Sequence, residues 1–106
     1  MTKLSDASLQ LRRRYVARIP AKVATLSETV ESLGHSAHEA AKTIRGLAHQ
    51  IAGSAASYGF AELGVLAQAT ELADPTQLEM RTRALIAKLE AIYDQHGREL
   101  APPAPR

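Results

Sequence analysis

The chain has 106 residues, which is enough for one domain with its own core but not for two. It contains no Cys, which excludes disulfide bonds and thiolate metal sites, and its net charge of +2 is too small to indicate nucleic-acid binding by itself. Apolar residues make up 45% of the chain but aromatic residues only 4%. A core of Ala, Leu, Ile and Val suits closely packed helices better than a β-sandwich.

The first predicted helix covers about residues 6–19. Apolar side chains recur there at helical spacing, namely Leu9, Leu11, Tyr15, Val16 and Ile19. Pro20 lacks an amide hydrogen and should end or kink this helix. The residues before this helix carry no apolar signal segment, and no apolar run reaches the roughly 20 residues of a membrane span. We therefore expect a cytoplasmic protein with no membrane partner.

A second helix is predicted to begin at Pro20, since proline is tolerated in a first helical turn. Its apolar stripe consists of Val23, Leu26, Val30 and Leu33, and Gly34 is expected to end it in the left-handed conformation. Ser36 and Glu39 have the spacing of a capping box, in which each side chain bonds the other residue's amide. A third helix is predicted from there to Tyr58, with Gly59 as its stop.

The fourth helix is predicted from Phe60 to about Ala73. Asp74 and Pro75 then have the residue types of an N-cap and a first helical position, and the last helix runs to His96 with Gly97 closing it. We expect order over about residues 5–98 and a flexible, proline-rich tail over 99–106.

Short connections between long helices make neighbouring helices antiparallel. The prediction is one domain over residues 1–106, all-α, folded as an antiparallel (up-down-up-down) four-helix bundle with an additional short helix at the N-terminus.

His49 is the residue of the third helix that does not fit the core pattern. Each helical residue advances about 100° around the axis, so Ile44, Leu47, Ile51 and Tyr58 share one face. Ala48 and Ala55 lie at its edge. His49 points away from this face and is predicted to be exposed to solvent.

Small residues surround His49 on the outer ridge, namely Gly46, Ala52, Gly53 and Ala56, while Lys42 and Arg45 lie toward the start of the helix. A glycine inside a helix costs about 1 kcal/mol relative to alanine. Retaining two of them beside one histidine indicates that something approaches the imidazole closely, and the cations indicate that it is negatively charged. Each feature also has an inert interpretation. Gly53 would serve packing against another helix, and Ser54 would bond back to the Gln50 carbonyl.

The run from Ala48 to Phe60, followed by Leu63 and Glu71, resembles the histidine phosphotransfer (HPt) domain family. The pattern is a histidine, an apolar residue two positions later, glycine and serine four and five positions later, and a glycine that closes the helix. The segment from Tyr15 to Pro20 is similar to the family's N-terminal helix, which is broken by proline. The resemblance spans about residues 9–71 and implies the same bundle.

The resemblance implies a stand-alone intermediate of a multistep two-component phosphorelay, without an ATP-dependent kinase activity of its own. The phosphoacceptor would be His49, and Gly53 would make room for the partner. The partners would be receiver domains of response regulators or of a hybrid histidine kinase. The divalent metal would belong to the receiver, so this chain would need no cofactor and bind no metal. Glu71 or Gln68 would accept a hydrogen bond from Nδ1 of His49 and leave Nε2 to attack phosphorus.

This chain departs from the family at two positions next to the histidine. Gln50 and Ala52 stand where members of the family carry Lys or Arg, so Arg45 or Lys42 would have to supply positive charge. The departures leave open a helical adaptor that binds receivers without being phosphorylated.

Two further interpretations start from other residues. Arg12, Arg13, Arg14 and Arg18 would suit a nucleic-acid-binding module, but the low net charge and few aromatic residues argue against one. His35 and His38 lie near Glu39 and would suit a metal site, but Glu39 is better explained by capping, and His96 by the end of the last helix. We therefore expect no nucleic acid and no metal, and a monomer, because one phosphotransfer histidine needs no second copy.

Overall fold

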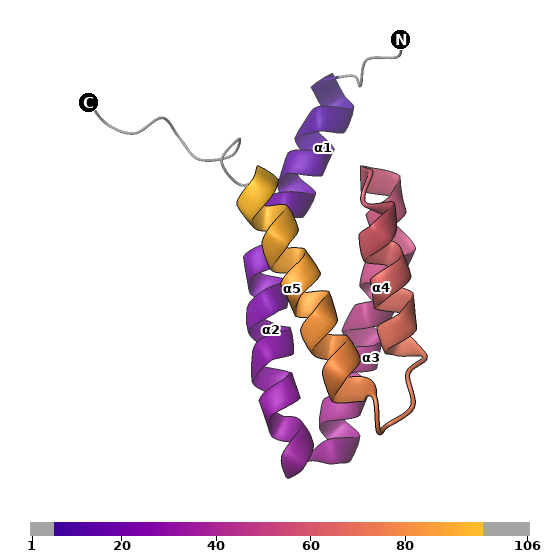
Figure 1. Ribbon diagram of the computed structural model, residues 1–106. Coiled ribbons are helices and arrows are strands. Elements are labelled where there is room, and N and C mark those ends of the chain that lie inside the picture. Colours follow the sequence, from indigo (N-terminus) through magenta and orange to yellow (C-terminus); the bar gives the residue numbers. More distant parts are fainter. Residues whose placement is uncertain (1–5, 97–106) are drawn as a thin grey trace, which may run out of the picture.

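The computed structural model describes residues 6–96, and these residues form helices joined by short turns (Figure 1). The predicted flexible tail over 99–106, the closing role of Gly97 and the predicted limits of order at 5 and 98 lie outside the described residues. The elements are α1 (Asp6–Ala17), α2 (Ile19–Glu31), η1 (Ser32–Gly34), α3 (Ala37–Ser54), η2 (Ala55–Tyr58), α4 (Ala61–Glu71) and α5 (Leu78–His96).

Helices α2 to α5 form an antiparallel bundle, in which each helix runs opposite to the one before it (Figure 1). The most extensive contacts join α3 to α4, α2 to α5 and α4 to α5. Helix α1 projects beyond one end of the bundle, where it touches η2 and the end of α5. The predicted all-α four-helix bundle with an additional N-terminal helix is confirmed.

The core consists of aliphatic side chains from all four bundle helices. Its largest fully buried members include Ile19, Leu26, Ile44, Ile51, Leu63, Leu85 and Leu89. Buried alanines, such as Ala48, Ala55 and Ala67, let the helices approach closely. Leu9 and Leu11 were predicted on the apolar stripe of the first helix but are exposed, because the start of α1 extends past the bundle.

Tyr15 attaches α1 to the rest of the molecule. Its ring stacks on Tyr58 of η2 with centroids 4.4 Å apart, and its hydroxyl lies 3.0 Å from the Ser54 hydroxyl. Phe60 lies on the other side of this cluster, 6.1 Å from Tyr15, with the Arg12 guanidinium 4.8 Å above its ring. The aromatic residues of this chain are few, and three of them meet at this joint.

Ser36 is the N-cap of α3, but the predicted capping box is wrong. The Ser36 side chain makes no capping hydrogen bond. The Ser36 amide, which Glu39 would have to accept from, already donates to the Ser32 carbonyl at 2.8 Å. The turn of η1 therefore uses the donor that a capping box needs, and α3 starts through backbone bonds alone.

Gly59 adopts the left-handed conformation predicted for the end of the third helix, with φ of +88°. The last residues before it tighten from α-helix into the 3₁₀ turn η2, which the periodicity did not predict. Gly34 was predicted to be left-handed as well, and this is wrong. Among residues 6–96 only Gly59 has a positive φ, and Gly34 belongs to the 3₁₀ turn η1.

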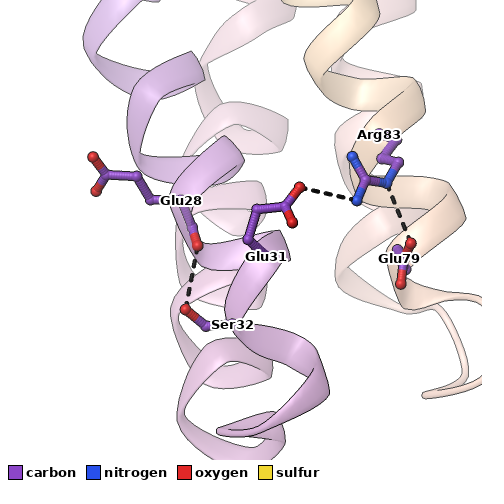
Figure 2. A network of polar contacts seen from close by, with 5 residues as sticks. All are labelled: Glu28, Glu31, Ser32, Glu79 and Arg83. Atoms are coloured by element: carbon purple, nitrogen blue, oxygen red, sulfur yellow. Dashed lines mark hydrogen bonds and ion pairs between the residues drawn. The ribbon is translucent and has the colours of Figure 1, made fainter.

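The last helix starts later than predicted. The Asp74 carbonyl accepts the Gln77 amide at 2.9 Å, which makes a turn and not the first turn of an α-helix. Helix α5 begins only at Leu78. At the same end of the bundle, Arg83 of α5 reaches Glu31 of α2 and Glu79 of its own helix, each at 3.3 Å (Figure 2). The pair with Glu31 links α2 to α5, and both exposed ion pairs add little stability.

Candidate functional site

His49 lies on the outer ridge of α3, and its side chain is 74% exposed. Its neighbours Ala48 and Ile51 are fully buried, so the helix turns the imidazole outward while it anchors the backbone in the core. The predicted exposure of His49 is therefore confirmed.

Glu71, at the end of α4, holds the imidazole from the side. Its Oε2 atom lies 2.7 Å from Nδ1 of His49. A carboxylate can only accept a hydrogen bond, so the proton of the neutral ring sits on Nδ1. No hydrogen bond from the described residues reaches Nε2, whose lone pair is free and faces solvent. This arrangement presents a nucleophilic nitrogen in one orientation.

Arg45 also reaches the end of α4. It lies one turn before His49, and its Nη1 atom donates to the main-chain carbonyl of Glu71 at 2.6 Å. The last carbonyls of a helix have no partner within the helix and carry partial negative charge, so a cation is favoured there. Two contacts from α3 thus converge on Glu71, one on its carboxylate and one on its main chain.

The glycines of this ridge face open space. A β-carbon added at Gly46 or Gly53 would meet nothing within 4 Å outside the adjoining helix backbone. Gly53 therefore does not serve close packing against another helix. Ala52 is half-buried and Ala56 is exposed, so no long side chain covers this part of the ridge. The clearance that the sequence indicates around His49 is present.

The other predicted site residues surround His49 without touching it. Lys42 and Gln50 are exposed on α3. Gln68 is exposed on α4, one turn before Glu71, and no hydrogen bond joins it to His49. The Ser54 hydroxyl donates a hydrogen bond to the Gln50 carbonyl at 3.0 Å, as its inert interpretation predicted.

Leu72 is a surface residue that the sequence reasoning missed. It follows Glu71 directly and is 72% exposed. Val65, two turns earlier on α4, is 67% exposed. The sequence could have identified both as apolar residues of α4 that lie outside its buried stripe, which consists of Leu63, Ala67 and Thr70. Exposed apolar side chains suit a protein partner, and Leu72 directly follows the residue that contacts His49.

The residues considered for a metal do not converge. Within residues 6–96 no three His, Asp or Glu side chains come together in a group that would hold a metal ion. His35, His38 and Glu39 are all exposed at the start of α3. Over the same residues, no helix is both long enough and apolar enough to cross a lipid bilayer.

A model of the Hpt domain family matches residues 10–99, which is most of the chain. The chain belongs to the Hpt domain family. Comparison with curated proteins and with solved structures gave no match. The Hpt domain mediates phosphotransfer in two-component phosphorelays, and it interacts with receiver domains and histidine kinases.

The motif of this Hpt domain is divided between core and surface. Ile51, Phe60 and Leu63 are buried, Gly59 ends η2, and His49 and Gly53 are exposed on α3. Part of the pattern therefore maintains the bundle, and another part lies at the surface.

Proposed function

We propose that His49 accepts a phosphoryl group from a receiver aspartyl phosphate, or passes one to a response-regulator aspartate, or does both. The observation that carries this proposal is the contact between Glu71 and Nδ1, which leaves Nε2 free on an exposed ridge. In the accepting direction, Nε2 attacks phosphorus in line with the bond to the aspartate oxygen. A nitrogen–phosphorus bond forms, the phosphorus–oxygen bond breaks, and the aspartate leaves as a carboxylate.

The chain contributes position and a stabilising charge. Glu71 fixes the ring and stabilises the positive charge that the imidazole gains as Nε2 bonds to phosphorus. Gly46 and Gly53 leave room for a receiver to bring its aspartate within reach. We expect the exchange to take place in the cytoplasm, with the chain as a monomer. We propose that this chain uses no cofactor and that the divalent metal is the receiver's.

The second candidate is an adaptor that binds receivers without being phosphorylated. Gln50 and Ala52 favour it, since neither offers a cation to the incoming phosphoryl group. Arg45 contacts the Glu71 carbonyl, so part of its donor capacity is already used. The two candidates share a docking face and differ only in whether His49 reacts.

A labelling experiment separates the candidates. The purified chain is incubated with phosphorylated receiver domains from the same genome, and labelled phosphate on the chain is measured. We expect phosphate that is labile in acid and stable in alkali, the behaviour of phosphohistidine. It should be lost in His49→Gln, whose fold should be unchanged because the side chain is exposed.

His38→Gln is the matched control, since His38 is another exposed histidine of α3. It should be labelled like the wild type. Labelling that persists in His49→Gln would contradict the assignment of His49. Receiver binding without any label on the wild type would favour the adaptor.

A further inference from the structure

A basic pocket of about 370 Å³ lies beside the His49 ridge. Its lining includes Arg14 and Tyr15 of α1, Arg18 between the helices, Lys22 of α2, and Gln50 and Ser54 of α3. Gln50 follows His49 directly in the chain. The pocket therefore begins at the edge of the surface that a receiver would cover.

The lining of this pocket carries three positive charges and no carboxylate. Among the described residues, none of Arg14, Arg18 and Lys22 forms an ion pair. Lys22 is half-buried with its ammonium 5.2 Å from the centre of the Tyr15 ring. Burial, and after it the nearby Arg18, lowers the pKa of Lys22. A negatively charged group in the pocket would relieve the repulsion among these cations.

The size of a protein interface connects the pocket to the histidine. A typical partner covers about 800 Å² of the surface, a patch with a radius of about 16 Å. Packed helices lie only about 8–10 Å apart. A receiver centred on His49 therefore extends past α3 and over the junction of α1 and α2.

We propose that the basic pocket binds acidic side chains of the receiver partner and forms a second contact beside the transfer site. This inference rests on the proposed function. Charges at the rim of an interface act mainly on the association rate and on partner choice. The pocket would thus determine which receivers are captured, while His49 and Glu71 carry out the transfer.

Charge reversal tests the pocket without touching the transfer site. Arg14→Glu combined with Arg18→Glu is compared with the wild type for transfer from the receiver that labels the wild type fastest. We expect kcat/KM at low salt to fall by about tenfold or more. The fall in kcat/KM should come from a higher KM, and the transfer rate at a saturating receiver concentration should change little. Added salt should slow transfer to the wild type and reduce the difference in kcat/KM between the wild type and the double variant.

Arg13→Glu, tested singly against Arg14→Glu, is the matched control, because Arg13 carries the same charge on α1, about 100° around the helix from Arg14, is exposed and does not line the pocket. It should stay within about threefold of the wild type. Labelling by a small phosphodonor, phosphoramidate, should be equal in all these variants, since it needs no docking. If neither the phosphorylated receiver nor phosphoramidate labelled the wild type, that result would contradict the proposed function itself.

Three results would overturn the pocket proposal alone. The first is a double variant with wild-type transfer kinetics, and the second is an effect of Arg13→Glu as large as that of Arg14→Glu. The third is salt-sensitive binding of duplex DNA that the double variant loses, which would assign these cations to nucleic acid.

Discussion

At the scale of single residues, the site depends on a chain of two hydrogen bonds from α3 to Glu71. His49 bonds to its carboxylate and Arg45 to its main-chain carbonyl. The second bond holds the end of α4 in place, so that the first can form in one geometry. We therefore propose that Arg45 acts as a positioning residue, in addition to supplying the positive charge expected from the sequence.

Removing the Arg45 contact should loosen the imidazole. In Arg45→Met we expect Nδ1 and Nε2 to share the proton, which ¹⁵N chemical shifts of the ring report. Phosphoryl transfer should slow by about three- to tenfold, since a charge-assisted hydrogen bond is worth about 1.5–3 kcal/mol and only part of it acts on His49. Lys42→Met removes the same charge, but the Lys42 side chain makes no hydrogen bond to the described residues. An equal effect of Lys42→Met would show that charge, and not position, matters.

The sequence predicted these residues unequally. The exposure of His49 followed from helical geometry alone, because its neighbours are core residues. The role of Glu71 came only from the family resemblance. The Arg45 contact was not predicted, since it depends on where α4 ends. The sequence predicted an end at about Ala73, and the helix ends two residues earlier, at Glu71.

At the scale of elements, α3 retains glycines at a cost to its own stability. A β-carbon at Gly46 or Gly53 would meet nothing within 4 Å, so both glycines weaken the helix without a packing reason for the missing side chain. The start of α3 shows a kind of hydrogen-bond competition that residue spacing does not reveal. Ser36 begins α3 where expected, but η1 uses the Ser36 amide, and this competition between adjacent turns is not visible in residue spacing.

Substitutions at Gly53 should separate stability from docking. Gly53→Ala should raise the free energy of unfolding by about 0.5–1 kcal/mol, because the helix gains rigidity and nothing clashes. Gly53→Gln should also fold, but its longer side chain should block transfer from receivers while labelling by phosphoramidate persists. Urea unfolding and transfer rates test both. Normal receiver transfer in Gly53→Gln would contradict the need for clearance.

At the scale of the whole molecule, one aromatic joint fixes α1 to the bundle. The amphipathic stripes predicted the four packed helices, because each needs a partner for its apolar face. The same stripes placed Leu9 and Leu11 in contact with the core, yet of the α1 residues whose burial is described only Tyr15 and Val16, in the last turn, are buried. A stripe indicates that a helix has an apolar face, not how much of it is covered.

This joint should respond to alkaline pH. Burial raises the pKa of Tyr15 above its ordinary value of 10.0, and the hydrogen bond to Ser54 offsets part of that shift. The unfolded chain therefore loses the Tyr15 proton at lower pH than the folded chain, so this contribution to stability falls as pH rises through about 10. Tyr15→Phe should cost about 1 kcal/mol at pH 8, from the lost hydrogen bond.

The difference between the wild type and Tyr15→Phe should then shrink above pH 10, as measured by urea unfolding at several pH values. Tyr93→Phe, at an exposed position, is the control and should follow the wild type. A difference that stays constant with pH would contradict the raised pKa.

The contact between Glu71 and His49 joins two helices, and this has a consequence for the chemistry. A peptide of α3 alone would contain the histidine and its glycines but would lack the carboxylate that distinguishes the two ring nitrogens. Such a peptide would react at either nitrogen and give two phosphoramidate isomers, of which a receiver could use one. If His49 is phosphorylated as proposed, the regiochemistry of its phosphohistidine is therefore a property of the assembled bundle, and it would report local separation of α3 from α4 while the rest of the fold persisted.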